Sequence, residues 1–99
     1  MNRTALQQEV LMVLASSRTK ARARSLELVP HLFQPPSPMD SLLPDLIADA
    51  SARVRAQAVR AAAQYSDQYL PLIAMRLADK DRRVAEAARS IAGAAAINR

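Results

Sequence analysis

Positive charge is concentrated at three short polar stretches, each lying between two segments with helical patterning. The clusters contain Arg18, Lys20, Arg22 and Arg24, then Arg53 and Arg55, then Lys80, Arg82 and Arg83. Three carboxylates nearby offset part of this charge, namely Asp49, Asp79 and Asp81. In a stack of helix pairs such turns line up along one edge, so we call the three clusters together the basic ridge. This ridge would attract an acidic protein segment or a phosphate backbone, or it is a solvated rim that forms only local ion pairs.

Residues suited to catalysis or metal binding are scarce. The chain has no cysteine, a single histidine (His31) and a single glycine (Gly93), which leaves no thiolate site, no histidine metal centre and no glycine-rich phosphate loop. Asp79 and Asp81 fit a turn and a helix cap better than an acid–base pair. We therefore expect a protein that is not an enzyme and that needs neither cofactor nor metal.

The composition favours helices over strands. Alanine is abundant and glycine almost absent, and 99 residues suffice for one domain. The aromatic residues are Phe33, Tyr65 and Tyr69, and we expect the two tyrosines to pack in the core across a helix junction. No apolar run approaches the ~20 residues of a membrane span, so we expect a cytoplasmic protein with no membrane partner. The formal charge of +5 is compatible with acidic partners.

An internal repeat organises these segments. A shift of thirty residues places Leu42 on Leu72, Asp49 on Asp79 and Val54 on Val84, among other matches. A shift of thirty-three relates a weaker first copy to the second and places Lys20-Ala21-Arg22 on Arg53-Val54-Arg55. Stacked helix pairs repeat at this spacing. The sequence thus predicts six helices in three hairpins, with repeats at about 3–33, 39–65 and 66–97 and a proline-rich connector at 34–38.

Helix boundaries follow from capping residues and prolines. The predicted N-terminal caps are Thr4, Thr19, Asp40 or Ser41, Ser51, Ser66 and Asp81. Pro30 should weaken or end the second helix, whose buried stripe would include Leu28. Pro44 should lie in the first turn of its helix, and Pro71 should kink the helix that contains it.

The second and third repeats resemble a HEAT repeat. The resemblance is carried by Leu70-Pro71-Leu72-Ile73, by Leu77-Ala78-Asp79 and by Arg83-Val84, and by Asp49 with Val54-Arg55 in the repeat before. It implies a short right-handed α-solenoid in which turn aspartates and second-helix arginines form a polar ladder between repeats. The residues matching the ladder positions are Arg22, Asp49, Arg55 and Asp79. Ser16 and Ala85 replace an aspartate and an arginine of that pattern, which leaves the ladder incomplete at the ends.

We expect a non-catalytic protein–protein interaction module or scaffold whose partner presents an acidic segment or a helix. The candidate contacts are Arg24, Arg53, Arg55, Gln57, Arg60, Gln64, Arg82, Arg83 and Arg89. The alternative is nucleic-acid binding to phosphates along the basic ridge, although the ridge contains no aromatic residue for base stacking. Because HEAT-like proteins include pigment-attachment lyases, the resemblance also implies a third role, as an accessory to cofactor attachment. The alanine-rich end, Ala92 with Ala94-Ala95-Ala96-Ile97, is a candidate homodimer surface.

Overall fold

The computed structural model describes residues 2–97, with side chains up to residue 95, and this part of the chain is helical without any strand. Its helices are α1 (Arg3–Leu14), α2 (Thr19–Leu26), α3 (Val29–Leu32), α4 (Met39–Ile47), α5 (Ala52–Tyr65), α6 (Leu70–Met75) and α7 (Arg82–Ile97). Two short 3-10 helices flank α6, namely η1 (Asp67–Tyr69) and η2 (Arg76–Ala78). The all-α prediction is confirmed, but the described residues form seven α-helices where six were predicted.

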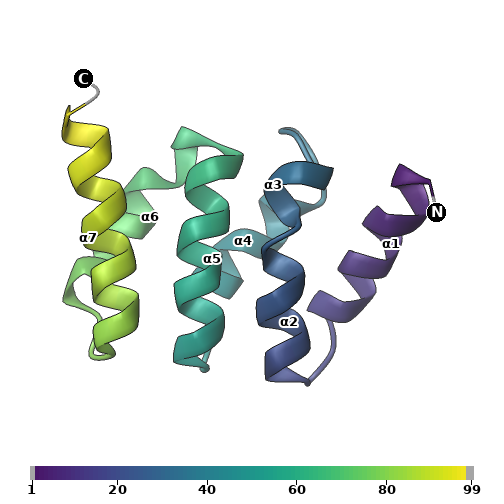
Figure 1. The fold of residues 1–99 in the computed structure, drawn as a ribbon, viewed down its shortest axis with the longest axis horizontal. Coiled ribbons are helices and arrows are strands. Elements are labelled where there is room, and N and C mark those ends of the chain that lie inside the picture. Colours follow the sequence, from purple (N-terminus) through teal and green to yellow (C-terminus); the bar gives the residue numbers. More distant parts are fainter. Residues whose placement is uncertain (1, 98–99) are drawn as a thin grey trace.

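The helices form two layers. Helices α2, α5 and α7 lie side by side in one layer, and α4 and α6 lie behind them, as Figure 1 shows. Helix α5 is central, because it packs against α2 and α7 on either side and against α4 behind it. Helix α1 packs against α2 and α3 at the N-terminal end and is inclined to α2 in this view. The molecule measures 37 × 29 × 19 Å.

Pro30 accounts for the additional helix. A proline has no N–H to donate and its ring clashes with the carbonyl four residues earlier, which here belongs to Leu26. Helix α2 accordingly ends at Leu26, and Pro30 lies in the first turn of the separate helix α3. This break turns Leu28 outward, where 46% of its surface is exposed, so its predicted burial was wrong.

The other two prolines also differ from prediction. Helix α4 begins at Met39, which places Pro44 inside the helix beyond its first turn. Pro71 does not kink a continuous helix, since it lies in the first turn of α6, where its missing N–H costs nothing.

Only some of the predicted caps hold. Ser51 caps α5 by accepting from Val54 N, and Asp81 accepts from Arg83 N at the start of α7. Ser66 caps the short helix η1. The other predicted caps were wrong: Asn2 caps α1 in place of Thr4, while α2 and α4 follow Arg18 and Pro38 without a side-chain cap, so that Thr19, Asp40 and Ser41 are already helical.

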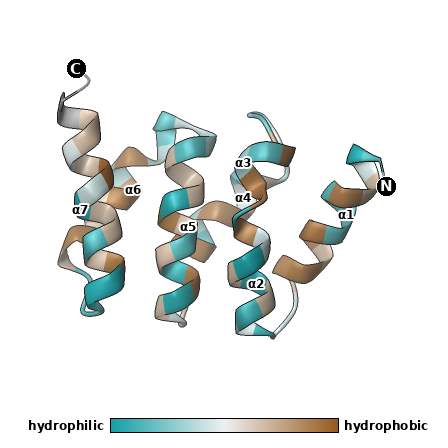
Figure 2. Ribbon diagram, viewed as in Figure 1, coloured by the Kyte–Doolittle hydropathy of each residue, from teal (hydrophilic) through white to brown (hydrophobic). Residues whose placement is uncertain are grey.

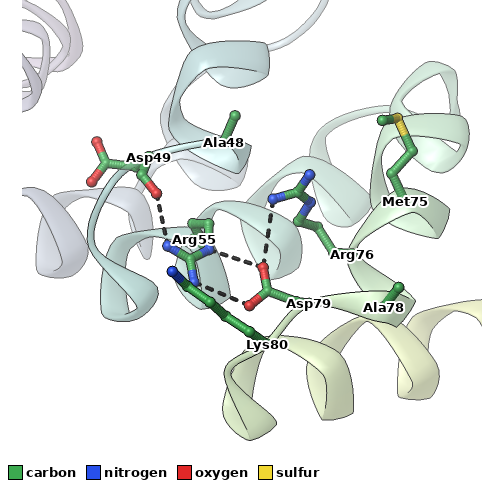
Figure 3. Close-up of a pocket in the computed structure, with 8 residues that line it drawn as sticks. All are labelled: Ala48, Asp49, Arg55, Met75, Arg76, Ala78, Asp79 and Lys80. Atoms are coloured by element: carbon green, nitrogen blue, oxygen red, sulfur yellow. Dashed lines mark hydrogen bonds and ion pairs between the residues drawn. The ribbon is translucent and has the colours of Figure 1, made fainter.

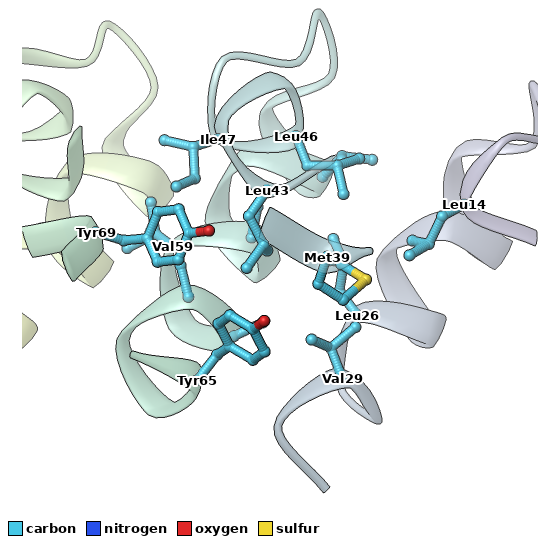
Figure 4. Packing of buried hydrophobic residues seen from close by; sticks show 14 of the residues in the cluster. Leu14, Leu26, Val29, Met39, Leu43, Leu46, Ile47, Val59, Tyr65 and Tyr69 are labelled. Carbon is cyan, nitrogen blue, oxygen red and sulfur yellow. The ribbon is translucent and has the colours of Figure 1, made fainter. Parts of the chain in front are cut away.

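The core lies between the two layers (Figure 4). Leu26, Met39, Leu43 and Ile73 are its largest fully buried side chains. Tyr65 and Tyr69 are also buried, with ring centroids 6.1 Å apart, as predicted for core packing at the helix junction. The hydropathy colouring in Figure 2 shows α4 and α6 as more apolar and α2, α5 and α7 as mixed.

Polar contacts tie the proline-rich connector to this junction. The hydroxyl groups of Ser37 and Tyr65 lie 2.7 Å apart, and the Tyr69 hydroxyl donates to the Asp40 carboxylate at 2.6 Å. Burial together with the hydrogen bond to Asp40 raises the pKa of Tyr69 to about 12. The bond from Tyr69 and that from Ser37 N lower the pKa of Asp40. The connector is therefore held by specific bonds to neighbouring elements.

Candidate functional site

The three turns that carry the basic clusters share one local geometry. In each, a side-chain oxygen accepts a hydrogen bond from the backbone N–H two residues later. The bonds are Arg18 N to Ser16 Oγ (3.1 Å), Ser51 N to Asp49 Oδ2 (2.8 Å) and Asp81 N to Asp79 Oδ1 (2.9 Å). The acceptors occupy the positions related by the sequence shifts of thirty-three and thirty. Serine thus fills the same role in the first turn that aspartate fills in the other two.

Arginines link these turns to one another. Both terminal nitrogens of Arg22 donate to the carboxylate of Asp49, one turn further along the molecule. Arg55 repeats this arrangement with Asp79, through Nε at 2.9 Å and Nη2 at 3.0 Å. Arg55 Nη1 also donates to the backbone oxygens of Asp49 and Ala50, as Figure 3 shows for Asp49. All four predicted ladder residues are therefore brought together in two equivalent pairs.

The second pair is the more buried. The side chains of Arg55 and Asp79 are 8% and 3% exposed, against 16% and 14% for Arg22 and Asp49. The hydrogen bond from Arg55 lowers the pKa of Asp79, and the reciprocal bond raises the pKa of Arg55. Arg55 is thus buried with its donors engaged in the ladder, unlike the exposed arginines among the candidate contacts.

A hollow of about 320 Å³ lies over this pair. It is lined by Ala48, Asp49, Arg55, Met75, Arg76, Ala78, Asp79 and Lys80 (Figure 3). Arg76 Nη1 lies 3.5 Å from Asp79 Oδ2, whereas Arg76 Nε is buried without a hydrogen-bond partner. Within the part of the chain that the structure describes, no group of histidine and acidic side chains is placed to hold a metal ion. The hollow is best explained as the surface of a structural ion-pair network.

Several exposed cations lie elsewhere, on the layer formed by α2, α5 and α7. Their helical spacing places Lys20 and Arg24 on one stripe of α2, and Arg53 and Arg60 on one stripe of α5. Arg89 is exposed on α7. Among residues 2–95, none of these cations has a carboxylate within ion-pair distance. Gln57 and Gln64 continue the α5 stripe and bear hydrogen-bonding groups without charge.

Arg82 and Arg83 have local partners. Arg82 pairs with Glu86 one turn along α7 at 2.9 Å, and Arg83 pairs with Asp81 at 3.3 Å. Their side chains are 90% and 67% exposed, and ion pairs this exposed contribute little to stability. Both arginines can therefore leave these pairs at little cost in stability.

The sequence did not lead us to one candidate contact residue and two hydrogen bonds. Lys20 belonged to the basic ridge but was not selected as a contact, although its spacing of four from Arg24 indicates a shared face. The bonds of Asp40 to Tyr69 and of Ser37 to Tyr65 span 29 and 28 residues and have no local sequence signal.

No helix in the described residues is long and apolar enough to cross a membrane. Comparison with known proteins gave no match, whether to a family model, a curated protein or a solved structure.

Proposed function

We propose that the chain is a short HEAT-like α-solenoid of three stacked helix pairs. Support comes from the turn geometry that recurs at Ser16, Asp49 and Asp79 and from the two equivalent arginine–aspartate pairs. Stacking explains these features, because one helix pair cannot cover its own apolar face and needs its neighbours to bury it.

We further propose that the layer of α2, α5 and α7 binds an acidic segment of another protein. One observation carries this proposal: the exposed cations Lys20, Arg24, Arg53, Arg60 and Arg89 have no carboxylate partner in the described chain. Their positive field would speed association with a segment of opposite charge and orient it along the layer.

Nucleic acid is the alternative ligand for the same cations. Proteins that bind single strands stack bases on exposed aromatic rings, whereas Phe33, Tyr65 and Tyr69 are only 4%, 6% and 4% exposed. The surface would be left with phosphate contacts alone, which favours a protein ligand.

The test compares three fluorescent probes of equal charge at 50 and 300 mM salt: a glutamate-rich helical peptide, a single-stranded oligonucleotide and a DNA duplex. We expect the peptide to bind most tightly and the double variant Arg53→Glu/Arg60→Glu to weaken it at least tenfold. Arg3→Glu is the control, because Arg3 is exposed on α1 outside this layer. Tighter, steeply salt-dependent binding of either nucleic acid would overturn the proposal.

A further inference from the structure

A groove of about 440 Å³ lies open between α1 and α2. It is lined by Val13, Arg18, Lys20, Ala21, Arg24 and Ser25. Its floor is apolar or small, formed by half-buried Val13, Ala21 and Ser25, while its rim consists of exposed cations. None of these residues takes part in the arginine–aspartate network.

The repeat register shows that the floor positions of this groove are more deeply buried elsewhere in the molecule. The floor positions Ala21 and Ser25 correspond to Val54 and Ala58 on α5, and to Val84 and Ala88 on α7. Those four residues are fully buried. Helix α5 packs against α2 as well as α4, and α7 packs against α5 as well as α6, so each has a further helix beside it from the preceding repeat. In Figure 1 α2 has α5 on one side, whereas on its other side only the inclined α1 follows.

Helices α2 and α5 carry small and medium apolar side chains among their buried residues. On α2 these are Ala23 and Leu26, and on α5 they are Ala56 and Val59, all buried. Both pairs have a spacing of three residues, which puts each pair on one helical face. A helix with this pattern would fit the α1–α2 groove.

Charge selects among the possible helices. The rim cations Arg18, Lys20 and Arg24 favour a helix with acidic residues beside its apolar stripe. Helix α7 of a second copy is a poor occupant, because Glu86 and Arg89 stand at the α7 positions that correspond to Ala56 and Val59. Both are exposed, and Arg89 would meet the basic rim.

We propose that the α1–α2 groove is a docking site for an amphipathic acidic helix of a partner protein, which takes the place that α2 and α5 take against the following helix pairs. This inference rests on the proposed function, in that it specifies the form of the acidic partner and where it binds. The helix lays its apolar stripe on Ala21 and Ser25 and directs its carboxylates to the rim.

The test uses a fluorescent peptide copied from residues 51–65, with Arg53→Glu, Arg55→Glu and Arg60→Glu to make it acidic. It keeps the Ser51 cap and the packing residues Ala56 and Val59. We expect saturable binding to the full chain at 150 mM salt. The same peptide with Val59→Glu carries more negative charge, and it should nevertheless bind at least tenfold more weakly.

Variants of the protein locate the site. Ser25→Trp fills the groove without a change of charge and should weaken binding at least tenfold. Lys20→Glu/Arg24→Glu changes only exposed rim residues and supplies the same test if Ser25→Trp fails to fold. Two results would overturn the groove as the docking site and leave the proposed function standing. One is equal binding of both peptides. The other is binding that the groove variants leave unaffected but that Arg53→Glu/Arg60→Glu abolishes. Failure of every acidic probe would overturn both. Concentration-dependent self-association that Ser25→Trp abolishes would identify a second copy as the occupant and refute the acidic partner.

Discussion

Replacement of Arg55 by alanine should strongly destabilise the protein. Arg55 gives two charge-assisted hydrogen bonds to Asp79 and two bonds to backbone oxygens, and Asp79 is only 3% exposed. Without Arg55, Asp79 keeps the Asp81 N–H and a distant Arg76. Removal of one member of a buried ion pair costs about 3–5 kcal/mol. This is a large share of the roughly 5–15 kcal/mol that stabilises a domain.

The assay is urea denaturation followed by the helical circular dichroism signal, with the unfolding slope checked for constancy. Arg53→Ala is the matched control, because Arg53 lies two residues away, is exposed and has no ion-pair partner in the described residues. It should change the free energy of unfolding by at most about 0.5 kcal/mol.

A double-mutant cycle separates the pair from its surroundings. Arg55→Ala/Asp79→Ala should cost less than the sum of the two single changes, because neither buried charge is then left alone. The reasoning is refuted if Arg55→Ala costs no more than Arg53→Ala, or if the two single costs simply add.

Four further outcomes follow. Arg55 lowers the pKa of Asp79 below 3.8, so the stability that the Asp79 carboxylate contributes is complete above pH 3.8 and is lost as the pH falls through the pKa that Asp79 has in the folded protein. In an acid titration, the free energy of unfolding of Arg55→Ala should therefore decline less than that of the unaltered protein. Burial raises the pKa of Tyr69 to about 12, so the stability that the neutral Tyr69 side chain contributes is complete below pH 10 and is lost as the pH rises toward 12. Absorbance titration of Tyr65→Phe, in which Tyr69 is the remaining tyrosine, should detect this late ionisation. Leu43→Ala should lower the free energy of unfolding by about 2–5 kcal/mol, because Leu43 is fully buried; a loss below 1 kcal/mol, on the order of an exposed site, would contradict that packing. Gly93→Ala should raise the free energy of unfolding by about 0.5–1 kcal/mol, since an added Cβ on α7 meets no atom within 4 Å. The melting temperature should rise accordingly, and a lower one would contradict this prediction.

The parts of the fold that depend on local chemistry were predictable. Ser51 could be identified as a cap because an N-cap bond spans only three residues, and the α5 stripe from Val54 to Tyr65 follows helical periodicity. The prolines could be recognised as disruptive to helices, but the exact residues at which the helices begin and end around them could not be predicted. Pro30 divided a helix in two because it has no N–H to donate to the carbonyl of Leu26, four residues earlier.

The parts that depend on tertiary contacts were less accessible. Arg53 and Arg55 are both arginines of α5. Arg55 is a buried structural residue because Asp79 lies beside it, whereas Arg53 is exposed. The groove beside α2 depends on which helix lies next to it in space, and the sequence of α2 alone does not specify that neighbour.

The burial pattern of α5 separates stability from recognition. Arg53, Arg60 and Gln64 are its only exposed positions, and the rest of the helix is buried or half-buried. Substitutions at these three sites can alter what the surface attracts while the interior stays intact. Under the proposed function, ligand preference can therefore diverge, through natural variation or by engineering, without compensating changes elsewhere in the chain.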